Sequence, residues 1–178
     1  MEADWEFEIG PDAPLIETSW SGFVDLRAHP ERASELCECR ELPGLAEALI
    51  RLNVVSSPVS TSKTDVFRPE TIDPDEMDAS AENATHTIAC YIDLLRRNDQ
   101  SWKVPIEAER DCRDLCEKLR ADLLRNCRVD IVVRRAMAAD GSDLAATVYF
   151  TACGSTLGHA QNTLAECLAK FTEVIAPR

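Results

Sequence analysis

The chain has 178 residues, 45% of them hydrophobic and 29% charged, which is long enough for one well-packed domain and too short for two large ones. Its 19 Lys and Arg residues against 32 Asp and Glu residues give a formal net charge of -13. This charge repels phosphate backbones and anionic lipid surfaces, so it argues against nucleic-acid and membrane binding, although such acidity also serves solubility alone. We expect a single domain over residues 1–178.

The N-terminus and the cysteines predict a cytoplasmic protein. Residues 1–8 are acidic, whereas a signal peptide begins with basic residues and continues with an apolar stretch. No apolar run approaches the roughly 20 residues that span a bilayer. Most of the eight cysteines occupy apolar positions of expected helices and strands, where a free thiol behaves as a small hydrophobe. We therefore expect reduced thiols in the cytosol.

The first half of the chain predicts strands around one helix. Residues 5–9 alternate apolar residues with glutamates, which is typical of a short edge strand. Residues 20–27 predict the first full strand, and Pro43 begins a helix with leucines at helical spacing. Residues 59–67 are rich in Thr, Ser and Val, which favours an exposed or edge strand.

A polar segment then separates the two halves. Residues 68–84 are acidic, with no Lys or Arg after Arg68, so we expect a long solvated loop at about 68–84. Loops of this length within a domain are usually functional or mobile. Residues 85–95 predict a strong strand after the loop.

The second half predicts two amphipathic helices around a hairpin. Pro105 begins a helix whose apolar stripe runs from Ala108 to Leu123. The apolar runs 129–137 and 145–153 are separated by Asp140-Gly141, a dipeptide typical of hairpin turns. A final helix has its apolar stripe between Leu157 and Ile175, and Ser155 or Thr156 can cap its first turn.

This element order predicts the α+β class. Two strand-helix-strand units are followed by one further strand and helix, which favours a ferredoxin-like pair of split β-α-β units extended by the C-terminal hairpin and helix. We expect the helices mainly on one face of a largely antiparallel sheet. Residues 23–26 (Phe-Val-Asp-Leu) and 91–94 (Tyr-Ile-Asp-Leu) also share one pattern, so the two units could be repeats, although similarity this short also arises by chance.

Alternation within these two phrases predicts which side chains share a face. Val24, Leu26, Ile92 and Leu94 should face the helices. The opposite face, with an additional tyrosine from the hairpin, is the candidate ligand or partner face: Phe23, Asp25, Tyr91, Asp93 and Tyr149.

The two aspartates of that face allow several interpretations. If Asp25 and Asp93 lie close together, they could perform acid-base catalysis or hold a divalent cation. They could equally be solvated, or paired with Arg27, Arg134 or Arg135. An open face with aromatic and acidic residues could instead dock a protein or a second copy of the chain, without catalytic geometry.

A second weak catalytic candidate lies between the last strand and the last helix. Cys153 precedes a helix N-terminus, where free amides can lower a thiol pKa, and His159 follows on that helix as a possible base. The same residues also fit a buried thiol beside an ordinary helix cap.

Taken together, the residues favour a binding or accessory protein over an enzyme. We predict that the exposed sheet face binds a protein partner, a small ligand or a second copy of the chain. The alternative is a small cytosolic enzyme that uses Cys153 or the Asp25/Asp93 pair. We predict no cofactor and no metal, because the spacing of Cys37, Cys39 and His29 lacks a second ligand pair.

Overall fold

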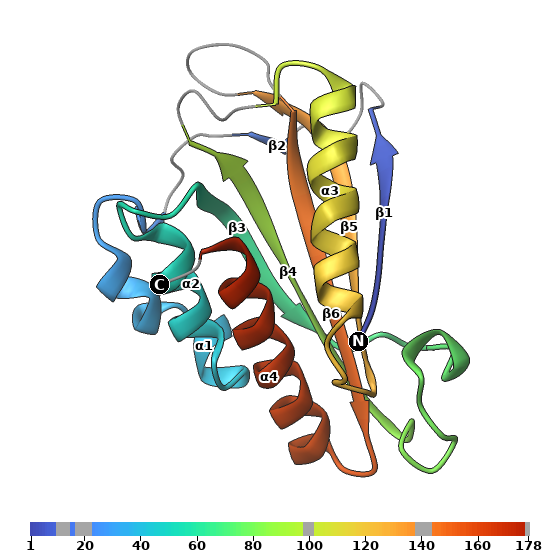
Figure 1. Cartoon of the computed structure of the whole chain (residues 1–178). Helices are drawn as coiled ribbons and strands as arrows, with labels where there is room; N and C mark the ends of the chain where they lie inside the picture. Colours follow the sequence, from blue (N-terminus) through green and yellow to red (C-terminus); the bar gives the residue numbers. More distant parts are fainter. Residues whose placement is uncertain (10–14, 17–22, 98–101, 138–143, 177–178) are drawn as a thin grey trace.

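The structure of the protein, a computed structural model, describes residues 1–9, 15–16, 23–97, 102–137 and 144–176. It is an α+β fold with one mixed sheet, in the strand order β1-β5-β6-β4-β3, and the two-residue β2 also pairs with β5 (Figure 1). The strands are β1 (Glu2–Glu8), β2 (Leu15–Ile16), β3 (Val59–Phe67), β4 (His86–Arg96), β5 (Cys127–Met137) and β6 (Leu144–Gly154).

The pairings within the sheet are of both kinds. The pairings β5–β6, β6–β4 and β4–β3 are antiparallel, whereas β1 and β2 pair parallel with β5. β3 is one edge and carries an irregularity between Thr61 and Thr64. The other edge is β1, so the edge strand expected at residues 5–9 is confirmed, with a start at Glu2.

Three helices cover one face of this sheet and leave the other face to a loop (Figure 1). α3 lies along β1, α4 crosses β6 and β4, and α2 packs beside β3 and α4. Among the described residues, no helix is long and apolar enough to cross a membrane. The helical segments are η1 (Pro30–Glu35), α1 (Glu38–Glu41), α2 (Leu45–Asn53), η2 (Asp75–Met77), α3 (Pro105–Arg120) and α4 (Leu157–Ile175).

The core lies between these helices and the sheet, as the apolar stripes predict. Phe171 of α4 and Phe150 of β6 are fully buried and meet edge to face, with ring centroids 4.8 Å apart. Thr156 caps α4, because its hydroxyl accepts a hydrogen bond from the His159 backbone amide. The stripe of α3 ends earlier than expected: the helix stops at Arg120, and Leu123 is 93% exposed.

The prediction of a first strand at residues 20–27 is wrong for the part of it that the structure describes. Residues 23–27 form no strand, and 20–22 lie outside the described residues. The Asp25 carboxylate accepts hydrogen bonds from the backbone amides of Arg27 (3.0 Å) and Ala28 (3.4 Å), which fixes a turn that competes with strand pairing. The two similar phrases therefore adopt different structures, and neither a repeat nor the ferredoxin-like arrangement is confirmed.

The sidedness of these phrases nevertheless agrees with the prediction for the apolar residues. Ile92 and Leu94 of β4 are buried under the helices. Leu26 is buried in the same core, and Val24 packs against it, although neither belongs to a strand. The Asp140-Gly141 turn lies outside the described residues.

Candidate ligand-binding groove on the open sheet face

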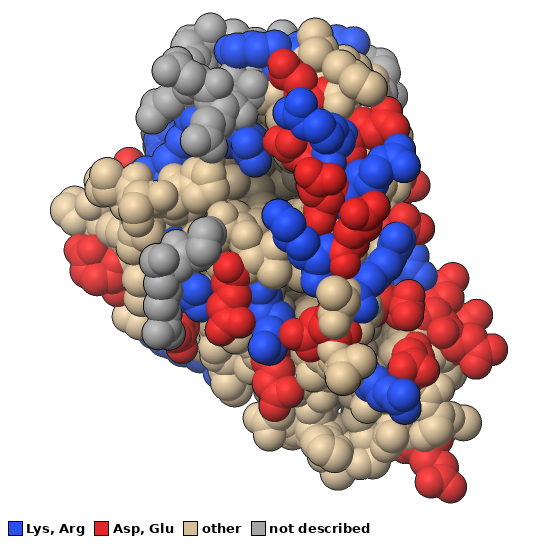
Figure 2. All heavy atoms as spheres, in the orientation of Figure 1, with Lys and Arg blue, Asp and Glu red and all other residues tan. Residues whose placement is uncertain are grey.

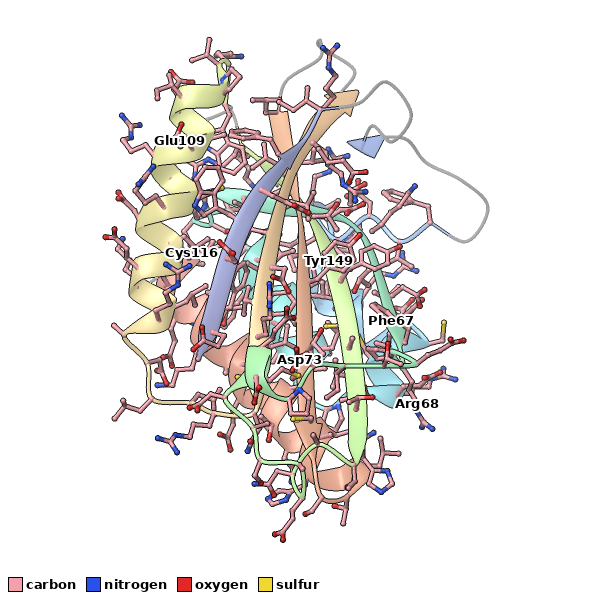
Figure 3. All side chains as sticks on the ribbon, turned by 90° about the vertical axis from the view of Figure 1, so that its right-hand side faces the viewer. Phe67, Arg68, Asp73, Glu109, Cys116 and Tyr149 are labelled. Atoms are coloured by element: carbon pink, nitrogen blue, oxygen red, sulfur yellow. The ribbon has the colours of Figure 1, made fainter. Side chains whose placement is uncertain are left out.

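The floor of a groove is formed by β1, β5 and β6 on the face away from the helices. In β1 the residues 3, 5 and 7 point toward α3, so the intervening acids point to the open side. Figure 3 shows Glu109 and Cys116 of α3 on one side of the sheet and Tyr149 and Asp73 on the other. The floor residues with charged or hydroxyl-bearing side chains are Asp4, Glu6, Glu8, Arg128, Asp130, Arg134, Tyr149 and Thr151.

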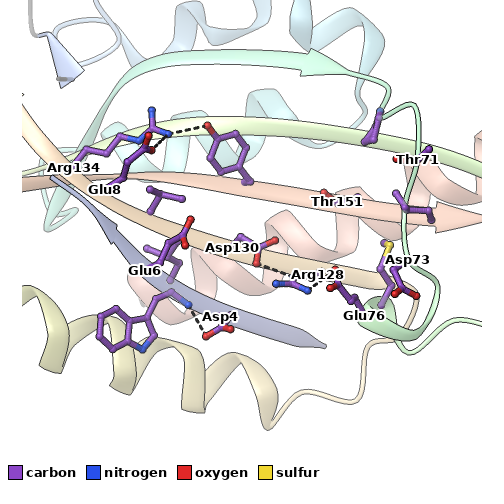
Figure 4. A pocket seen from close by; sticks show the side chains of 17 residues that line it. Asp4, Glu6, Glu8, Thr71, Asp73, Glu76, Arg128, Asp130, Arg134 and Thr151 are labelled. Carbon is purple, nitrogen blue, oxygen red and sulfur yellow. Dashed lines mark hydrogen bonds and ion pairs between the residues drawn. The ribbon is translucent and has the colours of Figure 1, made fainter. Parts of the chain in front are cut away.

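The acidic loop that follows β3 forms the wall of this groove. Most of residues 68–84 are exposed, as expected of a solvated loop, and part of the segment also folds back over the sheet, where it borders a cavity of about 630 Å³ together with the floor (Figure 4). Met77 is only 3% exposed and anchors the loop by burial. The wall residues are Pro69, Thr71, Ile72, Asp73, Glu76 and Met77.

Arg128 joins the wall to the floor. Its Nε donates a hydrogen bond to Asp130 Oδ1 at 2.7 Å, and its Nη1 lies 2.9 Å from Glu76 Oε2. Burial raises the pKa of Asp130, and the nearby carboxylates of Asp4 and Glu76 act in the same direction, while Arg128 opposes them. One guanidinium therefore neutralises only part of a crowded group of acids.

A second arginine connects β5 to its neighbours at the other end of the groove. Arg134 Nη2 lies 2.6 Å from Glu8 Oε2 and 3.4 Å from the Tyr149 hydroxyl. Its Nε is buried and has no hydrogen-bond partner among the described residues. Counted together, six carboxylates and two guanidiniums line the groove, so its charge is negative.

The predicted face residues divide between this groove and a second cavity. Tyr149 lines the groove, and its ring centroid lies 5.9 Å from that of Tyr91, its direct neighbour on β4. Tyr91 and Phe23 both line the second cavity, of about 870 Å³, beside β3. The tyrosine pair thus stands between two hollows of one sheet face.

The predicted pair of aspartates has little support from this geometry. Asp93 lies on the open face but is only 5% exposed, and it accepts a hydrogen bond from the Thr147 hydroxyl at 2.8 Å. Burial raises the pKa of Asp93. Asp25 is held in its own turn, with Arg27 Nε 3.5 Å from its Oδ1, so each carboxylate has a local structural role.

Cys153 and His159 do not form the arrangement that a nucleophile requires. Cys153 is fully buried, and this burial raises the pKa of its thiol, opposite to the shift that activates a cysteine. The exposed His159 has its Nδ1 3.3 Å from the Ser155 hydroxyl. Among the described residues, no cluster of three or more His, Cys, Asp or Glu side chains could hold a metal ion.

No family model, curated protein or solved structure matches this chain. The arrangement of its own residues is therefore what bears on function. The acids of β1 and Arg128 were not among the residues singled out from the sequence, and Arg134 was named there only as a possible partner of the two aspartates. The alternation of β1 was visible, but nothing local indicated that β1 pairs parallel with β5 and places Glu8 beside Arg134.

Proposed function

We propose that the protein is a non-catalytic binding protein whose acidic groove receives a basic, extended segment of a protein partner. The observation that carries this proposal is the cavity of about 630 Å³ lined by six carboxylates and only two guanidiniums. Lys and Arg side chains of a partner would pair with the acids, and the net charge of -13 would attract such a partner at long range.

The shape of the groove also supports an extended ligand. Its floor crosses three strands. The ion pair of Arg128 with Glu76 lies at one end, and the ion pair of Arg134 with Glu8 lies at the other. Tyr149 offers an aromatic surface between them, on which the stem of a basic side chain can lie. Both arginines already have carboxylate partners, and Asp4 lies 3.6 Å from Arg120 outside the groove, which leaves Glu6 and Asp73 as the acids with the most freedom to pair with a ligand.

A reducing compartment fits this proposal. All eight cysteines are free, and six of them are buried. We therefore propose the cytosol as the location, and we expect neither nucleic acid nor anionic membranes among the partners, because both would be repelled by the same charge.

A binding experiment with defined peptides tests the proposal. The probes are a fluorescent decapeptide of alternating Lys and Val residues and its counterpart with Glu in place of Lys. We expect saturable binding of the basic peptide alone, with an affinity that falls as salt increases. Glu6→Lys should weaken it by more than about tenfold through direct repulsion in the groove.

A matched variant separates local from global charge. Glu47 is exposed on α2, on the helix-covered side of the sheet, and Glu47→Lys changes the net charge by the same amount. We expect an effect below about twofold from this control. Equal effects of the two variants, or no binding of the basic peptide, would contradict the groove proposal. Concentration-dependent dimerisation that Glu6→Lys abolishes would instead identify a second copy as the occupant.

A further inference from the structure

A separate cleft lies on the opposite side of the sheet, between α3 and α4. The two helices diverge over β4 and β6, and the space between them has a volume of about 270 Å³ (Figure 1). This is just below the roughly 300 Å³ at which pockets for drug-sized ligands begin, so an occupant must be small.

The inner part of the cleft is apolar. Its floor consists of buried side chains of three strands, including Leu94, Ile131 and Val148. Leu115 of α3 and Val174 of α4 form its sides. Such a lining accepts a branched or aromatic hydrocarbon group.

One wall of the cleft is fixed by a polar network. The indole Nε1 of Trp102 donates a hydrogen bond to Asp111 Oδ2 at 2.9 Å, and the Arg96 guanidinium lies 5.4 Å from the centre of the Trp102 ring. Arg96 and Asp111 also form an ion pair at 3.3 Å. These three residues satisfy one another, so the wall is formed before any ligand enters.

The rim of the cleft also carries one acidic and one basic side chain that do not take part in this network. Asp114 and Lys118 line the cleft from α3, and neither has an ion-pair or hydrogen-bond partner in the described part of the chain. They are four residues apart on the helix, which places their Cβ atoms about 5–6 Å from each other. In Figure 2, charged side chains crowd along α3, and uncharged surface lies beside them toward α4.

We propose that this cleft binds a free apolar α-amino acid. The ammonium group would pair with Asp114 and the carboxylate with Lys118, while the hydrocarbon side chain enters the apolar part of the cleft. A zwitterion matches the rim because its two charges are carried close together at one end of the molecule. The site lies on the other face of the sheet from the acidic groove, so it does not depend on the function proposed for that groove.

Nuclear magnetic resonance with matched ligands tests this proposal. The reporter is the indole N–H signal of Trp102 in the full chain, assigned with the variant Trp102→Phe. The probes are leucine, 4-methylpentanoate, which lacks the ammonium, 3-methylbutylamine, which lacks the carboxylate, and glycine, which lacks the hydrocarbon. We expect a saturable shift with leucine and at least about tenfold weaker binding of the other three, because each loses one of the contacts.

Two exposed substitutions then connect each charge to its partner. Asp114→Asn should abolish the preference for leucine over 4-methylpentanoate, and Lys118→Gln should abolish the preference over 3-methylbutylamine. Glu117→Gln, on the same helix but outside the cleft, should change neither preference. The proposal is overturned if leucine gives no saturable shift up to about 10 mM. It is also overturned if the analogues bind as well as leucine, or if Lys118→Gln acts no more than Glu117→Gln.

Discussion

Replacing Arg128 by methionine should release the loop wall of the groove. Arg128 is 27% exposed and bridges Asp130 in the floor and Glu76 in the wall, at 2.7 and 2.9 Å. Methionine keeps an apolar stem of similar reach and removes both the hydrogen bond to Asp130 and the ion pair with Glu76. The loop then remains attached chiefly through the buried Met77 and through Asp78, which lies 3.3 Å from Arg125.

The expected loss of stability depends on how exposed the two partners of Arg128 are. The ion pair with Glu76 contributes about 1 kcal/mol at most, because the Glu76 side chain is 60% exposed and solvent screens the attraction. A loss of about 1 kcal/mol in the free energy of loop opening corresponds to about fivefold faster amide exchange. Asp130, left half-buried without its partner, should lower the global stability by a further 1–3 kcal/mol, on the order of one unpaired polar group.

Hydrogen exchange measured by mass spectrometry on residues 69–79 detects this change. The amides of Met77 and Ala79 donate to the Pro74 carbonyl at 3.1 and 3.0 Å and report on loop opening. Arg125→Ala is the matched control, because both side chains of its pair with Asp78 are largely exposed and such pairs contribute little. We expect less than about twofold acceleration from it. The reasoning is refuted if Arg128→Met leaves exchange unchanged, or if both variants accelerate it equally.

Two further predictions concern buried groups. Because burial raises the pKa of Asp93, its folded form binds a proton to higher pH than its unfolded form, and stability falls as pH rises from about 3.8 through the raised pKa. Asp93→Asn should therefore gain stability relative to the native chain as pH increases, in urea midpoints measured along a pH series; parallel curves would contradict this. Maleimide at neutral pH should label the exposed Cys37 well before the buried Cys153, as measured by peptide mapping. Rapid labelling of Cys153, selective over the other cysteines, would instead support Cys153 as a nucleophile.

The helices and the inner strands could be predicted because their residues carry one pattern each. The stripes of α3 and α4 have a helical period, and the segments of β5 and β6 are rich in Val, Ile, Ala and Phe on the side that faces the helices, which is typical of inner strands with one buried face. Thr156 was one of two possible caps, and it is the residue that accepts the hydrogen bond from the His159 backbone amide. Such local patterns act within one element, so no knowledge of neighbours is needed to read them.

The first strand could not be predicted because its residues have a competing local structure. Phe23 to Leu26 has the alternation of a strand, but Asp25 accepts hydrogen bonds from two backbone amides that a neighbouring strand would otherwise use. Pro30 then begins η1 five residues later. Val24 and Leu26 still face the core although they belong to no strand, because the burial of apolar side chains is favourable in any backbone conformation.

The candidate site depends on pairing between distant segments, which no local pattern specifies. The parallel register of β1 and β5 places Glu8 beside Arg134, where the charges attract, but it also places Asp4 beside Asp130, where they repel. Glu76 from the loop is added to the same region, and Arg128 pairs with both Asp130 and Glu76. A sheet face that served only solubility would gain nothing from aligning two acids and enclosing them under a third. Cationic side chains entering the groove would relieve this repulsion, and that relief supplies binding energy that the free protein lacks.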